Sequence, residues 1–455
     1  MLEVGFIFPS SDYLFDPFRG DPFVHFQLLT ILEDHFGRDV EARLVDLRGI
    51  KRDSAIYHIP ECDVYLHSVY TLDYEEQCSI VKSLRSHYPR ARHIAGGPHA
   101  NMFTQESLEV FDALILGEGE RTVIQALEDF MGQRLERIYR DPKPVDINIY
   151  PHWRRHFLPA SATARKSVMN LKHKMGYEEL LGTTAMFSRG CPYRCHFCAI
   201  EYARLEVPGI RYRAPERVEE EIEYLKSQYG IQGLSLSDEI VLPLKEDQAQ
   251  RHLEAIGRTS IVWRGQCRVD GITSSLAALA RQSGCMAMGL GVESVWQRSL
   301  DIINKRTTVE GAKNTIRVLK ENDIEARIYL IIGLPGEPED IVERTWSFIE
   351  ETQPDLVYLA IFTLRPGTEV YNHPERFGIR EVLRDWKKMM HQHGKYRDEL
   401  PQLTFVYEEE TPWGRSMTPE QIIKNYTELL QRLRERGLNS FEFFGGKVET
   451  RSQPA

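Results

Sequence analysis

The sequence has no apolar run that approaches the roughly 20 residues needed to cross a bilayer, and no basic segment precedes its first apolar residues, MLEVGFIFPSS. It also has no excess of basic residues. The net charge is −10, which argues against a dedicated nucleic-acid binder because phosphate contacts are normally made by a basic face. These absences predict a soluble, cytoplasmic protein with no membrane span and no nucleic-acid partner.

Cysteine is scarce and mostly scattered, with seven in 455 residues. So few cysteines in so long a chain, without a secretory leader, do not suggest a disulfide framework. Four of them stand singly and are expected to be small buried hydrophobic residues: Cys62, Cys78, Cys267 and Cys285.

The other three cysteines lie in AMFSRGCPYRCHFCAI, residues 185–200. Cys191, Cys195 and Cys198 have the spacing C-x3-C-x2-C on a loop after an apolar run. Three thiolates at this spacing can hold a [4Fe–4S] cluster and leave one iron without a protein ligand. A structural zinc site is the alternative, but it normally needs four ligands. His196 lies in the loop, yet no second C-x2-C pair exists elsewhere.

The loop, with Phe197 directly before the third cysteine, resembles the signature of the radical S-adenosylmethionine (SAM) superfamily. The resemblance implies that the amino and carboxylate groups of SAM chelate the open iron. It also implies that an electron from the cluster splits the sulfonium and produces a 5′-deoxyadenosyl radical. An external electron donor of the flavodoxin or ferredoxin type is then an expected partner.

Residues 1–145 predict a Rossmann-like (flavodoxin-like) α/β domain, in which short apolar strands alternate with amphipathic helices. One helix pattern runs over 74–88 and is stopped by Pro89. In such an open parallel sheet, ligands bind beyond the carboxyl ends of the strands. Five runs have strand length: 4–8, 40–47, 63–69, 92–95 and 113–116.

Two glycine-containing segments at those strand ends, AGGPHA and LGEGE, together resemble the cobalamin-binding domain attached to many radical SAM enzymes. A glycine pair lets the backbone approach a large ligand closely. The resemblance implies that the corrin and its nucleotide tail lie on these loops. The candidate residues are Pro9, Ser10, His67, Ser68, Val69, Tyr70, Thr71, Gly96, Gly97, Pro98, His99, Gly117, Glu118 and Gly119.

The D-x-H-x-x-G motif, whose histidine ligates cobalt in other cobalamin proteins, is absent. Its absence predicts a cobalt with no protein histidine below it, unless His67 or His99 takes that place. Methylthiotransferases also carry an α/β domain before such a barrel, but theirs has three cysteines for a second cluster. Cys62 and Cys78 are too few for that group.

Residues 146–182 have many basic side chains and little periodicity, which predicts a linker between two domains. Two interpretations remain open at this stage. The linker either crosses through solvent or lines the substrate entrance, where it would meet an anionic group.

Residues 183–375 predict a partial (β/α)6 TIM barrel. Six repeats in about 190 residues, against ~250 for a closed barrel of eight, indicate a barrel that is open along one side. Reactive groups in such folds come from the carboxyl ends of the strands. Helix boundaries are also marked: Pro215 and Gly230 bracket one helix, and Thr308 is the expected cap of another. The six strand-like runs are 184–187, 233–237, 261–266, 287–292, 326–332 and 356–362.

Motifs at these strand ends resemble the SAM-binding segments of the family. The resemblance implies that Asp238 and Glu239 receive the amino group of SAM, and a carboxylate suits an ammonium. An acidic residue favoured near a helix start is the other explanation for each. GLGVES is implied to contact the ribose and carboxylate, and IIGLPGE to pack on adenine. The candidates are Phe197, Asp238, Glu239, Gln266, Arg268, Glu293, Ser294, Gly333 and Pro335.

Residues 376–455 predict a small, mainly helical C-terminal region. A helix that opens at Thr418 and Pro419 places four apolar residues on one face, expected to cover the barrel: Ile422, Tyr426, Leu429 and Leu433. The aromatic segment FEFFGG, 441–446, is expected to pack, with a place in the pocket as the alternative. The final RSQPA is expected to be frayed.

The leading hypothesis is a cobalamin-dependent radical SAM methyltransferase, which moves a methyl group from methylcobalamin to an unactivated carbon. A radical cyclase or rearrangement enzyme without net methylation would use the same motifs and stays open. A cobalamin-binding regulator that has lost catalysis is disfavoured because all three cysteines remain. The expected substrate is a small molecule, lipid or tetrapyrrole, since no peptide-recognition domain is evident.

Overall fold

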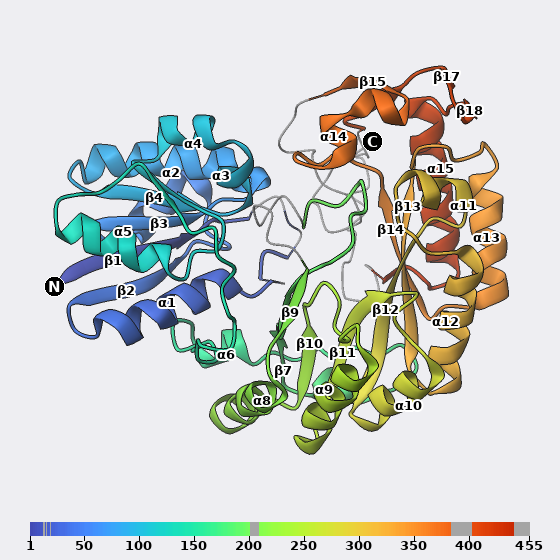
Figure 1. The fold of residues 1–455 in the computed structure, drawn as a ribbon, viewed down its shortest axis with the longest axis horizontal. Helices are drawn as coiled ribbons and strands as arrows, with labels where there is room; N and C mark the ends of the chain where they lie inside the picture. The colour runs from blue at the N-terminus through green and yellow to red at the C-terminus, as the bar shows by residue number, and fades with distance from the viewer. Residues whose placement is uncertain (12–13, 15, 19, 201–208, 384–402, 441–455) are drawn as a thin grey trace, which may run out of the picture.

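Two parallel β-sheets with their helices make up most of the molecule, and they lie beside each other (Figure 1). The computed structural model describes residues 1–455 except 12–13, 15, 19, 201–208, 384–402 and 441–455. The predictions for FEFFGG and RSQPA therefore concern residues outside the described part. Among the helices described, none is both long and apolar enough to cross a membrane.

The N-terminal sheet has six parallel strands in the order β2-β1-β3-β4-β5-β6, which confirms the Rossmann-like prediction. All five predicted strands are present. The sixth, β6, was not predicted because only one of its three residues, Tyr139, is buried, so it shows no apolar run. The bounds are β1 Leu2–Phe8, β2 Val40–Asp46, β3 Val64–Ser68, β4 Arg92–Gly96, β5 Ala113–Leu116 and β6 Ile138–Arg140.

Helices cover both faces of this sheet, which is why every residue of the central strand β3 is buried. Alternate residues of β3 face opposite sides: Val64 and Leu66 pack with α1 and α5, whereas Tyr65 packs with α2. The helices are α1 Phe23–Phe36, α2 Tyr74–His87, α3 Pro98–Met102, α4 Thr104–Val110 and α5 Thr122–Met131.

The second sheet also has six parallel strands, in the order β14-β13-β12-β11-β10-β7. Neighbours in the sheet follow the chain order, and in the described residues the first and last strands do not pair, so the sheet is an open half-barrel as predicted. The bounds are β7 Gly182–Ala185, β10 Gly233–Leu236, β11 Val262–Arg268, β12 Cys285–Glu293, β13 Glu325–Ile332 and β14 Leu356–Ile361.

The helices of the half-barrel lie on its outer face (Figure 1), and their ends follow the sequence signals. Gly230 ends α8 in the left-handed conformation, with φ 65°. The Thr308 hydroxyl caps α12 by accepting a hydrogen bond from the Gly311 backbone N–H at 3.0 Å. The helices are α8 Pro215–Tyr229, α9 Glu246–Arg258, α10 Ser274–Gln282, α11 Gln297–Ile302, α12 Val309–Glu321 and α13 Ile341–Thr352.

The C-terminal region contributes one long helix, α15 Pro419–Glu435, to this outer layer. A reciprocal pair of hydrogen bonds between Thr418 and Gln421 begins it. The four apolar residues predicted to share a face are all buried, which confirms that this helix covers the barrel. Four short strands were not predicted, because segments of two to four residues carry no readable period: β15 Ile379–Val382, β16 Phe405–Tyr407, β17 Glu410–Thr411 and β18 Gly414–Arg415.

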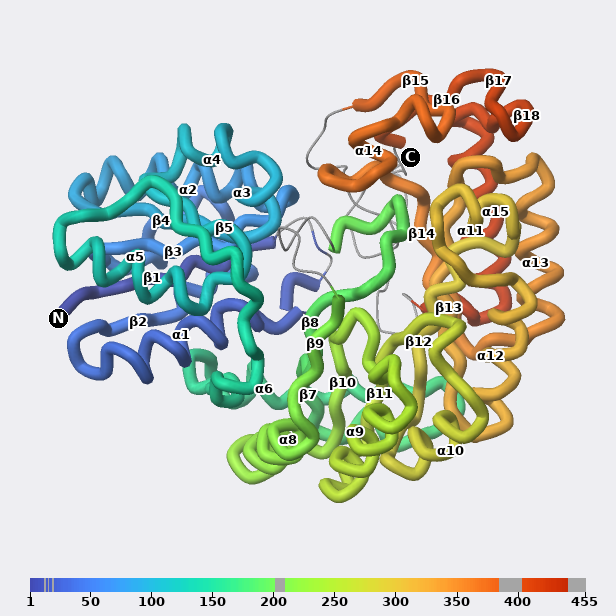
Figure 2. The backbone as a smooth tube through the Cα atoms, in the orientation of Figure 1, coloured from blue at the N-terminus to red at the C-terminus, as the bar shows by residue number. Residues whose placement is uncertain are grey.

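The segment between the two sheets closes the amino-terminal end of the half-barrel (Figure 2). Met169 is fully buried and packs with Leu171 against Met286 and Ala287 at the start of β12. The side chains of two arginines at strand starts donate hydrogen bonds to its backbone: Arg264 to the Val168 carbonyl at 2.9 Å, and Arg327 to the Asn170 carbonyl at 2.7 Å.

At residues 168–171 this arrangement differs from both interpretations of the linker. Residues 168–171 neither cross solvent nor lie at the carboxyl ends of the strands, because the parallel strands point away from them. Arg155 is likewise buried, where it donates to the Thr183 hydroxyl at 2.8 Å and to the Thr184 carbonyl at 2.7 Å. Its basic side chain therefore serves packing of the linker on β7.

Met169→Ala is expected to lower the free energy of unfolding by about 2–5 kcal/mol, because it empties a buried site under the strands. Met175→Ala is the matched control: Met175 lies on the same segment but is 94 % exposed, and its loss is expected to cost no more than about 0.5 kcal/mol. Urea denaturation of both variants measures the difference. Equal, small effects would contradict the role of residues 168–171 as a plug, that is, as the segment that closes the amino-terminal end of the half-barrel.

Candidate functional site

Two cavities lie at the carboxyl ends of the two sheets. The first, called the sheet cavity, has a volume of about 400 Å³ and is lined mainly by loops of the N-terminal sheet. The second, called the barrel cavity, has a volume of about 300 Å³ and is lined by the cysteine loop and the half-barrel interior. Ile200 and Glu239 line both cavities, so the two spaces adjoin.

The barrel cavity brings the three predicted cluster ligands together. Cys191, Cys195 and Cys198 all line it, and all three are free thiols. A turn in the loop, in which the Cys198 N–H donates to the Cys195 carbonyl at 3.0 Å, keeps the last two close. His196 does not line this cavity; its Nδ1 lies 3.0 Å from the carbonyl oxygen of Ile302. The predicted zinc alternative therefore lacks its fourth ligand here.

This donor set fits a cluster better than a single ion. Within the part of the chain that the structure describes, no three His, Cys, Asp or Glu side chains converge closely enough to hold one metal ion. Cluster thiolates each bind a different iron, so they surround a volume and need not meet at one point. Burial raises the pKa of the Cys195 thiol, and the positive charges of Lys305 and Arg268 oppose that rise. Those charges favour the thiolate that iron requires.

Arg268, at the end of β11, is fixed beside the cysteine loop. Its guanidinium carbon lies 3.6 Å from the centre of the Tyr193 ring, and its Nη1 lies 3.9 Å from Cys195 Sγ. It also donates to both carboxylate oxygens of Asp270 at 2.9 Å and to the Lys305 carbonyl at 2.8 Å. So many contacts fix a positive charge next to a cluster ligand, where negative charge collects.

A buried ion pair joins Lys305 and Glu293 at 2.7 Å across the same cavity. Glu293 is one of the predicted SAM residues, and its backbone adopts φ 66°, a left-handed conformation that is uncommon for a residue other than glycine. The register of β12 against β13 shifts at this point, which turns the glutamate. Such strain is often found at ligand sites. Lys305 was missed by sequence analysis because it follows a short helix rather than a strand.

The nine predicted SAM residues divide into two groups. Five line the barrel cavity: Phe197, Glu239, Gln266, Arg268 and Glu293. Four do not line it: Asp238, Ser294, Gly333 and Pro335. For Asp238 and Glu239 the division reflects their adjacency in the chain, since successive residues after a strand can point to opposite sides.

Asp238 shows this geometry, because its carboxylate points away from the cavity that Glu239 lines. Asp238 is 1 % exposed and accepts hydrogen bonds from the Phe187 N–H at 2.9 Å and the Ser188 hydroxyl at 2.6 Å. Burial raises its pKa to about 7. Of the two acidic residues implied to receive the SAM amino group, Glu239 lines the barrel cavity and Asp238 does not. Asp238 instead holds Phe187 and Ser188, which precede the cysteine loop.

Glu337 binds two further predicted SAM residues, Gly333 and Ser294, and links them to each other. Its carboxylate accepts hydrogen bonds from the Gly333 N–H at 2.8 Å and from the Ser294 hydroxyl at 3.3 Å. Burial raises the pKa of Glu337 to about 8. Ser294 and Gly333 therefore hold the ends of β12 and β13 together, and their polar groups are engaged with the protein.

The sheet cavity gathers nine of the fourteen predicted cobalamin residues: His67, Ser68, Tyr70, Gly96, Gly97, Pro98, Gly117, Glu118 and Gly119. Gly97 has φ 97°, and a Cβ there would lie 2.9 Å from the Val69 backbone, so only glycine fits this turn. Five predicted residues lie outside the lining: Pro9, Ser10, Val69, Thr71 and His99. Ser10, for example, is turned to Glu76, to which its N–H and hydroxyl donate at 2.7 and 2.9 Å.

Neither candidate histidine is placed as a metal ligand. The His67 ring nitrogens face protein atoms: Nδ1 lies 2.8 Å from Gln77 Oε1, and Nε2 lies 3.2 Å from His93 Nδ1. His99 is fully buried, stacks on Tyr74 at 4.0 Å and does not line the sheet cavity. Burial lowers the pKa of His67 to about 3 and that of His99 to about 4. The expectation of a cobalt without a histidine below it stays a prediction consistent with this arrangement.

Several lining residues of the sheet cavity were missed. Helix α1 supplies Phe23, Val24, Gln27 and Leu28, and the half-barrel supplies Met186 and Arg189. The sequence marks the α1 residues only as a helix face. The half-barrel residues come from more than 150 positions away from the first strand, and no local pattern signals such a meeting.

Comparison with known proteins agrees with this geometry. Residues 186–349 match the family described as the radical SAM superfamily. The anaerobic magnesium-protoporphyrin IX monomethyl ester cyclase of Cereibacter sphaeroides is 28 % identical over 313 residues, which are 62 % of this chain and 48 % of the relative. The chain thus spans about half the length of that relative. The bacteriochlorophyllide d C-12(1)-methyltransferase of Chlorobaculum tepidum is 23 % identical, over 65 % of this chain and 62 % of that protein.

Among solved structures, the radical SAM methyltransferase TsrM from Kitasatospora setae, with cobalamin and a [4Fe–4S] cluster bound, has the same fold. It superimposes with a TM-score of 0.62 over 81 % of this chain and 77 % of that one, at 16 % sequence identity. The family match contains the cysteine loop, and the likeness in fold covers more of the chain than that match. Residues 186–349, which contain the cysteine loop, therefore match the radical SAM superfamily, and the fold of the chain is like that of TsrM.

Proposed function

We propose that this enzyme transfers a methyl group from methylcobalamin to an unactivated carbon of a tetrapyrrole. The observation that carries the proposal is the junction of the two cavities at Ile200 and Glu239. A group held in the sheet cavity and a group held in the barrel cavity would both face a substrate at that junction. The two relatives whose names specify tetrapyrroles support the substrate class.

The residues of the barrel cavity would hold the cluster and SAM. Cys191, Cys195 and Cys198 are the proposed iron ligands, and Glu239 the proposed acceptor for the SAM ammonium. Arg268 and Lys305 add positive charge where thiolates and a carboxylate would collect. When bound, these groups supply a 5′-deoxyadenosyl radical from SAM and, from the corrinoid in the sheet cavity, a methyl group.

The protein's own contribution is placement and exclusion of water. The sheet cavity is walled by apolar side chains such as Phe6, Leu66 and Ile94, and by glycines that let a flat ligand lie on the backbone. Tyr329 and Tyr358 stack at 4.8 Å along one wall of the barrel cavity. An apolar enclosure protects a radical from reaction with solvent.

A second candidate function is radical cyclisation of a tetrapyrrole without net methylation. It is favoured by one specific observation, the 28 % identity to the anaerobic cyclase over 62 % of this chain. Both reactions would use the same two cavities, so the products decide between them.

Product analysis is the main test. The protein, reconstituted anaerobically with iron, sulfide and hydroxocobalamin, is incubated with SAM, a reductant and magnesium-protoporphyrin IX monomethyl ester. Methyl transfer is expected to release 5′-deoxyadenosine and S-adenosylhomocysteine together, with one methyl group added to the tetrapyrrole, as seen by mass spectrometry. Deoxyadenosine without S-adenosylhomocysteine would favour the cyclase. Formation of neither product would contradict both candidate functions.

Cys195→Ala is expected to abolish cluster binding, because only two of the three proposed iron ligands, Cys191 and Cys198, would then remain. Iron analysis after reconstitution should fall from about four atoms per chain to near zero, with loss of the brown colour. Cys78→Ala is the matched control, since Cys78 packs in the core of the N-terminal sheet and lines neither cavity. A brown, iron-replete Cys195→Ala variant would refute the proposed ligand set.

A size series at Gly119 tests the sheet cavity. A Cβ there would contact Leu28 at 3.5 Å, an ordinary distance, so Gly119→Ala should bind hydroxocobalamin as the unaltered protein does. Gly119→Trp should weaken binding by about tenfold or more, because overpacking costs about 1–3 kcal/mol. Titration followed by the corrinoid absorbance measures both. Equal affinities across the series would place the corrinoid elsewhere.

A further inference from the structure

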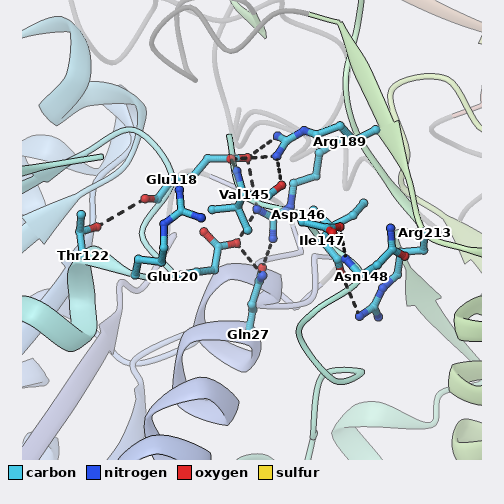
Figure 3. Close-up of polar contacts among 12 residues, drawn as sticks. Gln27, Glu118, Glu120, Thr122, Val145, Asp146, Ile147, Asn148, Arg189 and Arg213 are labelled. Carbon is cyan, nitrogen blue, oxygen red and sulfur yellow. Dashed lines mark hydrogen bonds and ion pairs between the residues drawn. The ribbon is translucent and has the colours of Figure 1, made fainter. Parts of the chain in front are cut away.

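A compact network of charges connects the rim of the sheet cavity with the strands that carry the cysteine loop (Figure 3). Glu118, between Gly117 and Gly119 on that rim, accepts hydrogen bonds from Arg211 Nη1 at 2.9 Å and from Arg189 Nη1 at 3.3 Å. The Val145 N–H adds a third at 2.8 Å. One carboxylate thus contacts both members of a separate two-stranded sheet that follows the first strand of the half-barrel.

A second carboxylate and an amide complete the network. Glu120 forms an ion pair with Arg189 at 2.5 Å, and Gln27 Nε2 donates to Glu120 at 2.6 Å. Figure 3 shows these three side chains and Glu118 pointing toward one another. The Gln27 amide oxygen also accepts a hydrogen bond from Arg189. Helix α1, the loop after β5 and the half-barrel therefore meet at one arginine.

Burial makes this network sensitive to the loss of any partner. The side chains of Glu118, Glu120 and Arg189 are 8 %, 3 % and 13 % exposed, and that of Arg211 is 21 % exposed. Burial is the largest single influence and opposes ionisation of Glu118, but the hydrogen bonds from Arg211 and the Val145 N–H, together with the charges of Arg189 and Arg211, outweigh it and lower the pKa of this carboxyl. Two carboxylates and two guanidiniums balance, so removal of one leaves a buried charge without compensation.

The position of the two arginines in the chain gives the network its consequence. Arg189 lies in β8 Ser188–Gly190, two residues before Cys191, and Arg211 lies in the antiparallel partner β9 Ile210–Tyr212. The cysteine loop leaves the protein core from this strand pair. A ligand that orders residues 117–119 therefore acts, through Glu118, on the base of the loop that holds the cluster.

We propose that Arg189 and Arg211 are positioning residues that couple the two cavities, so that corrinoid binding in the sheet cavity and cluster binding in the barrel cavity strengthen each other. Whichever group binds first restrains its end of this network, and the second then binds to a site whose remaining motion is smaller, at a lower entropic cost. Coupling of this kind is reciprocal by thermodynamic necessity. The inference rests on the proposed function only in that the sheet cavity takes a corrinoid.

The test compares hydroxocobalamin affinity of the full chain without its cluster and after anaerobic reconstitution. For the unaltered protein we expect about tenfold tighter binding in the reconstituted form, within the usual range for coupled sites. Arg211→Gln should reduce this ratio to near one, because it removes the positive charge and the pair of guanidinium nitrogens that bind Glu118. Arg211→Lys keeps the positive charge but has only one nitrogen to bind the carboxylate, so it should restore part of the ratio. A merely structural role would lower both affinities and leave their ratio unchanged.

Arg258→Gln is the matched control, since Arg258 forms an exposed ion pair with Glu219 at 2.7 Å on the outer helices and should keep the full ratio. Thermal melting shows whether each variant is folded, and the lysine variant carries the test if the glutamine variant is not. A ratio of one in the unaltered protein, or a full ratio in Arg211→Gln, would overturn the coupling while leaving the proposed function intact. Absence of corrinoid binding in every form would instead overturn the cobalamin part of the proposed function, and the coupling with it.

Discussion

The meeting of two parallel sheets at their carboxyl ends is the constraint on which the rest of the site depends. A parallel strand delivers its following loop to one edge only, so each sheet gathers its glycines, acids and cysteines on a single side. Here those sides face each other, and Ile200 and Glu239 belong to both cavities. The buried contacts of Arg189 with Glu118 and Glu120 keep the two edges together.

Much of the fold could be predicted because its strands are buried on both faces. Apolar runs such as 63–69 and 326–332 then identify strands directly, and Gly230 and Thr308 mark helix ends by their backbone requirements. The cysteine loop could be recognised because all three ligands are local in the chain. Strand β6 and the short C-terminal strands gave no such signal, since two to four residues cannot establish a period.

The candidate site was harder to predict in its details because the direction of a side chain depends on contacts between distant segments. Asp238 and Glu239 are adjacent in sequence, yet only Glu239 lines a cavity, while Asp238 is held by Phe187 and Ser188. Glu118 was expected at a ligand, but its carboxylate is engaged by Arg189 and Arg211, which follow it by more than 70 positions. Only the assembled fold shows these partnerships.

The plug beneath the half-barrel has a consequence for exchanging modules between related enzymes. Met169 and Leu171 cover Met286 and Ala287, and the backbone of 168–170 accepts hydrogen bonds from Arg264 and Arg327. A chimera cut at the first strand of the half-barrel would expose those apolar residues. It would also leave the guanidinium groups of Arg264 and Arg327 without their backbone acceptors. A half-barrel moved into another protein must therefore keep the segment that precedes it. The two modules should be joined before Arg155, within the residues that the sequence alone predicts to be a linker.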